Sequence, residues 1–190
     1  TPTQPYIQDF ENGRGGWDPA GLNSSWEFGT PAKSVIRGAA SGNNAWVTGG
    51  LGNGTYNATE FSYIVSPCMS FANITNPVIQ MKAWWSSEFN VDGAVLQYSL
   101  NGPAGPWVTI GDVGDPNNWY NSGGITGNPG GQQKGWTGEG QRSSNGWVLV
   151  QNELTGLGGN GFVTLRVAFG SNTTNQGDGF GFDDVTIFQK

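Results

Sequence analysis

The 190-residue sequence has no histidine and a single cysteine, Cys68. The lack of histidine excludes Ser-His-Asp and Cys-His catalysis and removes the commonest ligand of catalytic zinc. One cysteine cannot form an internal disulfide framework, which a domain of this size does not need. Because Cys68 lies between Pro67 and Met69, we expect it to be a small buried side chain rather than a reactive thiol.

Basic residues are also scarce, since 8 Lys and Arg stand against 14 Asp and Glu and give a net charge of −6. They form no cluster, so nucleic-acid binding is not expected, because neutralising phosphates requires a basic patch. No window approaches the roughly 20 consecutive apolar residues of a membrane-spanning helix, and membrane insertion is not expected either. The sequence also shows no useful stretch of helical periodicity.

Turn-forming residues and aromatic residues dominate what is present. The chain contains 33 Gly, 19 Asn, 14 Ser and 15 Thr beside 9 Trp, 5 Tyr and 10 Phe. The first group favours short elements joined by tight connections, and the second supplies a core. This composition predicts one all-β domain spanning residues 1–190.

Alternating apolar residues mark the clearest strands. Residues 163–169 place Val163, Leu165, Val167 and Phe169 on one face, and residues 79–85 and 94–100 repeat the pattern. One apolar face per strand predicts two antiparallel sheets packed as a jelly-roll sandwich. The side chains that point the other way could line a groove: Gln80, Lys82, Trp84, Gln97 and Ser99. Further strands are expected at residues 6–11, 25–28, 45–48, 61–65, 107–110, 147–151 and 180–188.

A long polar loop spans residues 111–146 and carries Trp119, Tyr120 and Trp136. Loops of that length tend to be functional. Aromatic rings flanked by amides such as Asn118 are typical of sugar recognition, so we predict that these four residues bind a ligand, with Trp84 as a further candidate. The alternative is that the loop folds back and its aromatic residues form a small core. The tryptophans in or beside strands are expected in the main core: Trp17, Trp26, Trp46, Trp85 and Trp107.

Carboxylates occupy both ends of the chain, in the segments 9–13 and 179–187. Strict alternation in the last strand puts Asp183 on the face of Val185, and Asp184 on the face of Phe182. A buried carboxylate must be hydrogen-bonded, paired with a cation or bound to a metal. Since Lys and Arg are few, calcium is a natural partner. The alternative is that these carboxylates accept backbone N–H bonds at the sheet edge.

The order of short motifs along nearly the whole chain resembles the MAM-type jelly roll, an extracellular module of meprins, neuropilins and receptor tyrosine phosphatases. These motifs are Asp9-Phe10-Glu11 followed by Gly16-Trp17, then Ser66-Pro67, and finally Phe182-Asp183-Asp184-Val185. The segments 43–48 and 92–99 look more like bacterial relatives, which often lie beside secreted hydrolases or in surface proteins. This resemblance implies an extracellular location. Vertebrate MAM domains usually carry four cysteines, so their homophilic adhesion is not carried over.

Related jelly-roll carbohydrate-binding modules have similar ends and hold a structural calcium between an N-terminal Glu and an Asp of the last strand. The resemblance therefore implies Glu11 and Asp183 as the leading calcium ligands. It leaves three weaker candidates, which are Asp9, Asn44 and Asp184.

An enzyme is not expected. Glu60, Glu88 and Asp92 lie near strands, but no spacing identifies an acid–base pair. The sequence instead predicts a non-catalytic extracellular module that binds polysaccharide or glycan and is stabilised by calcium. The alternative is a protein-interaction or adhesion module, in which the loop aromatics anchor another protein chain.

Overall fold

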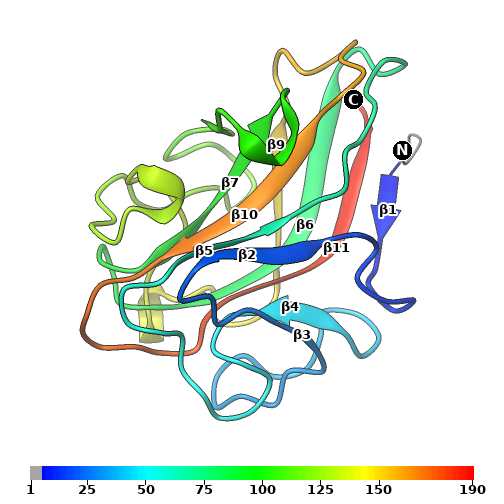
Figure 1. Ribbon diagram of the computed structural model, residues 1–190. Helices are drawn as coiled ribbons and strands as arrows, with labels where there is room; N and C mark the ends of the chain where they lie inside the picture. The colour runs from blue at the N-terminus through cyan, green and yellow to red at the C-terminus, as the bar shows by residue number, and fades with distance from the viewer. Residues whose placement is uncertain (1–5) are drawn as a thin grey trace.

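The computed structural model describes residues 6–190, which form two stacked antiparallel sheets (Figure 1). Sheet A has the strand order β3-β4-β11-β6-β9, and β1 pairs beside β4 along the same edge of β11. Its strands are β1 (Tyr6–Gln8), β3 (Glu27–Gly29), β4 (Ala45–Val47), β6 (Pro77–Ser86), β9 (Val148–Glu153) and β11 (Gly179–Gln189).

Sheet B has the order β2-β5-β10-β7-β8. Its strands are β2 (Asp18–Leu22), β5 (Phe61–Val65), β7 (Gly93–Ser99), β8 (Val108–Thr109) and β10 (Thr164–Gly170). The connections contain three short 3-10 turns, which are η1 (Gly102–Ala104), η2 (Pro129–Gly131) and η3 (Gly140–Arg142). The predicted all-β, two-sheet sandwich is confirmed. No helix in the described part of the chain has both the length and the apolar character needed to cross a membrane.

Among the strands of residues 6–190, β2 alone was not predicted from the sequence. It contains Pro19 and Gly21, which interrupt any β pattern, and all five of its residues are exposed. Proline cannot donate to a sheet ladder and is confined to edges and bulges, and β2 is indeed the edge strand of sheet B.

The core lies between the sheets and is rich in aromatic rings. Phe10 and Phe182 meet edge to face with their centroids 5.8 Å apart, and Trp17 lies 5.5 Å from Phe182. Four of the five tryptophans expected in the core are buried there: Trp17, Trp26, Trp46 and Trp85. The prediction is wrong for Trp107, which is half-buried on the outer face of sheet B. Cys68 is half-buried rather than fully buried.

Asp183 and Asp184 form a bulge in β11. The register between β11 and β6 shifts there, and Asp184 has a left-handed φ of 49°. A bulge adds one residue, so Phe182 and Val185 both point into the core. The strict alternation predicted for this strand is therefore wrong. Asp183 pairs in register with Lys82 on the outer face of sheet A.

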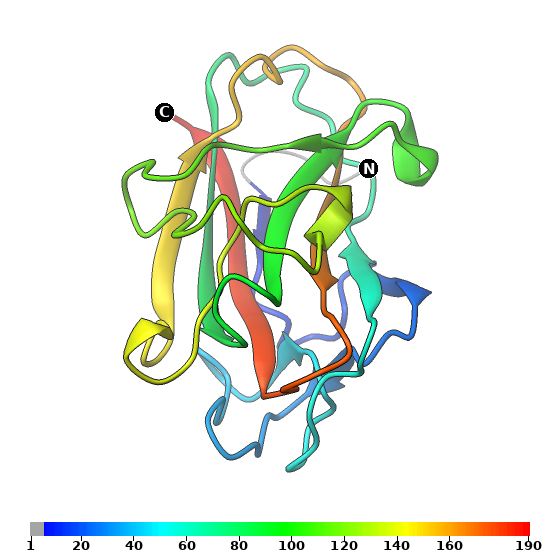
Figure 2. The same cartoon turned by 90° about the vertical axis from the view of Figure 1, so that its left-hand side faces the viewer.

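The long loop crosses the side of the sandwich between β9 of sheet A and β7 of sheet B (Figure 2). Isolated bridges attach it to both sheets, joining Gly138 to Ser87 and Trp136 to Ala94. The loop therefore covers the side of the sandwich where the β9 edge of sheet A and the β7–β8 edge of sheet B lie next to each other.

Candidate functional site

The loop aromatics predicted to bind a ligand are buried instead. Trp119, Tyr120 and Trp136 are 3%, 1% and 0% exposed, and their ring centroids lie 4.7–5.1 Å apart. Trp136 also stacks on Phe180 of β11 at 5.5 Å. Their polar atoms are satisfied inside the protein, since Tyr120 Oη donates to the Leu96 carbonyl at 3.0 Å. Rings enclosed in this way cannot stack on a sugar, and the predicted role as ligand-binding residues is wrong. The alternative, an aromatic core formed by the loop, is what the structure shows.

The other two predicted ligand residues have different surroundings. Trp84 points outward from β6 but is half-buried, because Trp147 packs edge-on against it at 5.8 Å. Its indole Nε1 is sealed from solvent and has no hydrogen-bond partner in the described residues. Asn118 is exposed and donates through Nδ2 to the Leu149 carbonyl at 3.0 Å. Neither residue lies with the other predicted ligand residues at an open site.

The predicted calcium ligands gather around one loop, residues 40–44. Asp183 Oδ2 accepts N–H bonds from Ala40 at 2.9 Å and Ser41 at 3.2 Å, and burial raises the Asp183 pKa to about 6. Glu11 Oε1 accepts the Asn44 N–H at 2.7 Å. These are the backbone hydrogen bonds of the alternative interpretation.

Two other candidates contribute less to this loop. Asp184 Oδ1 accepts the Ser41 hydroxyl at 2.7 Å, and exposed Asp9 accepts the Glu11 N–H at 3.1 Å. Within residues 6–190 no three His, Cys, Asp or Glu side chains are grouped closely enough to hold a metal ion. Glu11 Oε2, Asp184 Oδ2 and Asp9 Oδ2 accept no hydrogen bond from the described residues. Because no three such side chains are grouped, a calcium ion would depend on backbone carbonyls for most of its ligands.

Two of the three carboxylates considered for catalysis, Glu60 and Asp92, hold loops together. Glu60 is 1% exposed and accepts four hydrogen bonds, from Ser25 N, Ser25 Oγ, Asn57 N and Ser62 Oγ. Asp92 accepts the Tyr56 hydroxyl at 2.7 Å and the Asn172 N–H at 2.8 Å, and burial raises its pKa to about 6. Their donors are backbone and hydroxyl groups of neighbouring segments, which gives both residues a structural role.

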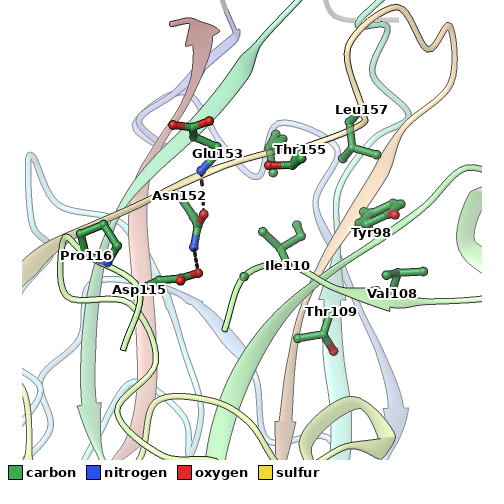
Figure 3. Close-up of a pocket in the computed structure, with 12 residues that line it drawn as sticks. Tyr98, Val108, Thr109, Ile110, Asp115, Pro116, Asn152, Glu153, Thr155 and Leu157 are labelled. Atoms are coloured by element: carbon green, nitrogen blue, oxygen red, sulfur yellow. Dashed lines mark hydrogen bonds between the residues drawn. The ribbon is translucent and has the colours of Figure 1, made fainter. Parts of the chain in front are cut away.

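A pocket of about 450 Å³ opens between the edge strands β8 and β9. Figure 3 shows residues of the β7–β8 side facing residues of the β9 side across the opening. Tyr98, Val108 and Leu157 provide apolar surface, while Asp115 and Asn152 provide polar groups. Asp115 belongs to the first part of the long loop, so this loop does contribute to a concave surface, although through other residues than predicted.

Several polar atoms that line the pocket have no hydrogen-bond partner in the described residues. Asp115 Oδ2 accepts N–H bonds from Asp112 at 2.7 Å and from Asn152 Nδ2 at 2.9 Å, whereas Oδ1 has no partner in the described residues. The hydroxyls of Tyr98 and Thr155 are likewise without a hydrogen bond in residues 6–190. Pockets of roughly 300–1,000 Å³ with mixed walls of this kind are typical of small-molecule sites. Local sequence patterns carry little sign of this pocket, because Tyr98 and Asn152 come from strands far apart in the chain.

The fold is a β-sandwich of the type found in carbohydrate-binding modules and adhesin domains. The K1 cleaved adhesin domain of Lys-gingipain from Porphyromonas gingivalis W83 superposes with a TM-score of 0.53 at 16% identity, over 98% of this chain and 99% of that one. The carbohydrate-binding module TmCBM61, solved with β-1,4-galactotriose, has a TM-score of 0.53 at 10% identity, over 96% and 95%. These identities establish a shared fold.

Sequence comparison gives a shorter match. Bacillopeptidase F of Bacillus subtilis (strain 168) is 33% identical over 90 residues, which is 47% of this chain and 6% of that protein. The chain thus spans a small part of the length of this relative. No family model matches the sequence.

Proposed function

We propose that this chain is a non-catalytic, extracellular carbohydrate-binding module whose ligand site is the pocket between β8 and β9. The observation that carries the proposal is the combination of an apolar wall with free polar atoms in that pocket. A sugar ring presents an apolar face and a rim of hydroxyls. Tyr98 and Val108 match the face, and Asp115 Oδ1 and the Thr155 hydroxyl match the rim.

Three further observations support the proposal. The fold is shared with a module that was solved with a galactotriose. The chain lacks histidine, and its buried carboxylates Glu60 and Asp92 are committed to structural hydrogen bonds. The resemblance to bacterial MAM-like modules favours an extracellular location, since those relatives accompany secreted hydrolases and surface proteins.

A binding screen with one pocket variant tests this function. We expect the purified domain to bind a neutral oligosaccharide or insoluble polysaccharide. We expect Asn152→Ala to weaken that binding by roughly tenfold, because it removes an amide from the pocket and one of the two hydrogen bonds that orient Asp115. Isothermal titration after a glycan array measures the loss. The matched control is Asn118→Ala, an exposed amide outside the pocket, which should bind as the wild type does.

If the domain binds none of the glycans tested, the proposal is contradicted and the alternative, a protein-interaction or adhesion module, is favoured. The surface that favours this alternative lies on the outer side of sheet B, where Leu22 of β2 pairs with Phe61 of β5 and both side chains are exposed. Binding to a protein partner, or self-association in sedimentation, would then be lost on Leu22→Ser.

Calcium at residues 40–44 forms a separate part of the proposal. Glu11 and Asp183 approach the same loop from the two ends of the chain, as the resemblance implied, and Glu11 Oε2 is free to bind a cation. A calcium ion bound only by the folded state would raise the melting temperature by mass action. We expect excess calcium to raise it relative to chelator, and Glu11→Ala to abolish the rise. Identical melting curves with calcium and with chelator would show that the folded domain binds no stabilising calcium.

A further inference from the structure

Arg166 is a buried cation that has no anionic partner within the part of the chain that the structure describes. It points outward from β10, between the inward residues Leu165 and Val167, yet it is 6% exposed. The ion pairs of the described residues involve other side chains, and no carboxylate within residues 6–190 lies within 4.0 Å of its guanidinium. A buried charge is costly unless it is paired or fully hydrogen-bonded.

Two aromatic rings cover the guanidinium group. Its Cζ lies 4.3 Å from the ring centroid of Trp107 and 4.7 Å from that of Tyr63. Both rings are half-buried and reach the outer face of sheet B from different segments, Tyr63 from β5 and Trp107 from the residue before β8. Such contacts stabilise a cation through the faces of the rings. They do not satisfy the N–H groups that lie in the plane of the guanidinium.

The in-plane donors are only partly used. Nε donates to Gln97 Oε1 at 2.8 Å, and Nη2 makes a long contact of 3.5 Å with the Gly130 carbonyl. Nη1 has no partner in the described residues and is not sealed from solvent. The Tyr63 hydroxyl is also without a hydrogen bond in residues 6–190.

The backbone around Arg166 is shaped to keep this arrangement. The turn η2 packs on β5, β7 and β10, and it is the yellow-green turn at the left of Figure 1. Gly130 has a positive φ of 62°, which favours glycine, and a Cβ there would displace the Gln97 amide that accepts from Arg166 Nε. Burial lowers the pKa of Arg166 to about 10, which leaves the group charged at neutral pH.

We propose that Arg166, Tyr63 and Trp107 form a second glycan subsite that takes the oxyanion of an acidic sugar, either the carboxylate of a uronic acid or a sulfate ester. The free edge of a guanidinium can donate two parallel hydrogen bonds to two oxygens of a carboxylate or a sulfate. The exposed part of the Trp107 ring offers an apolar surface beside it. Because the chain carries a net charge of −6, recognition depends on this local geometry rather than on general attraction. This subsite rests on the proposed function only in taking a glycan as the ligand.

Isothermal titration with three probes tests the subsite: trigalacturonic acid, a sulfated galactotriose and neutral galactotriose. We expect Arg166→Gln to weaken binding of an acidic probe by about tenfold or more and to leave neutral binding unchanged. Arg142→Gln is the matched control, because exposed Arg142 also stacks on an aromatic ring, with its Cζ 4.2 Å from the centroid of Phe89. Tyr63→Phe removes one hydroxyl and should cost about threefold.

The outcomes separate the subsite from the pocket. Loss of one acidic probe or of both on Arg166→Gln identifies the oxyanion and supports the subsite. If Arg166→Gln does not fold, Tyr63→Phe decides. Wild-type protein that binds neither acidic probe, or equal affinities in Arg166→Gln and Arg142→Gln, would overturn the subsite. Tighter binding of a poly-glutamate peptide than of either sugar would also overturn it. If the wild-type protein binds an acidic probe but not neutral galactotriose, the β8–β9 pocket is contradicted as a glycan site and the Arg166 subsite is still supported.

Discussion

Replacing Trp136 by alanine is expected to destabilise the protein by about 3–5 kcal/mol, because it removes a fully buried ring and leaves a cavity. The ring stacks on Phe180 of sheet A and touches Trp119 and Tyr120 of its own loop. Its Nε1 also donates to the Asn118 carbonyl at 3.0 Å. Since typical domains are stable by about 5–15 kcal/mol, urea unfolding should show a large fall in midpoint.

The matched control is Phe162→Ala. Phe162 is 70% exposed, so its loss should change the free energy of unfolding by no more than about 0.5 kcal/mol. The same experiment separates the two interpretations of the long loop. If Trp136 stacked on a sugar, Trp136→Ala would lose sugar binding and keep its stability. Because the ring closes the sandwich, we expect the variant to lose stability instead. If Trp136→Ala lowers the free energy of unfolding by less than about 1 kcal/mol, the loop does not depend on this ring.

The fold could be predicted from local patterns where each strand has one apolar face. The run 163–169 alternates strictly, and it became β10 with its apolar residues inward. The pattern fails where one residue is inserted, as at the Asp183–Asp184 bulge, because alternation carries no sign of an extra residue. It also fails for β2, whose edge position tolerates the proline that hides it.

The candidate sites were harder to predict, because burial depends on partners that are distant in sequence. Trp119 and Trp136 lie in a polar loop, which favours exposure, but the gap between two sheet edges buries them. Trp107 lies beside a strand, which favours the core, but it folds over Arg166 on the outer face. Alternation alone placed Gln97 outward, and it is the residue that binds the Arg166 Nε. The direction of a side chain was predictable in β7, whereas its neighbours across the sheet were not.

Replacing Glu60 by glutamine is expected to lower the free energy of unfolding by about 3 kcal/mol. The reason is geometric, because each carboxylate oxygen accepts one backbone N–H. Oε1 accepts from Ser25 N at 2.9 Å, and Oε2 accepts from Asn57 N at 3.1 Å. A hydroxyl such as that of Ser62 can rotate, but a backbone N–H cannot. Whichever way the new amide is oriented, its NH₂ group faces a backbone donor that is left unpaired.

Thermal and urea unfolding of Glu60→Gln measure this loss, with exposed Glu139→Gln as the control that should match the wild type. Sugar binding per folded molecule should be unchanged, because Glu60 lines neither the β8–β9 pocket nor the Arg166 subsite. The opposite pattern, in which Glu60→Gln melts normally and abolishes turnover of a polysaccharide, would make Glu60 an acid or base of an enzyme. The four donors that converge on this buried carboxylate favour the first result, since a catalytic group needs a free oxygen facing its substrate.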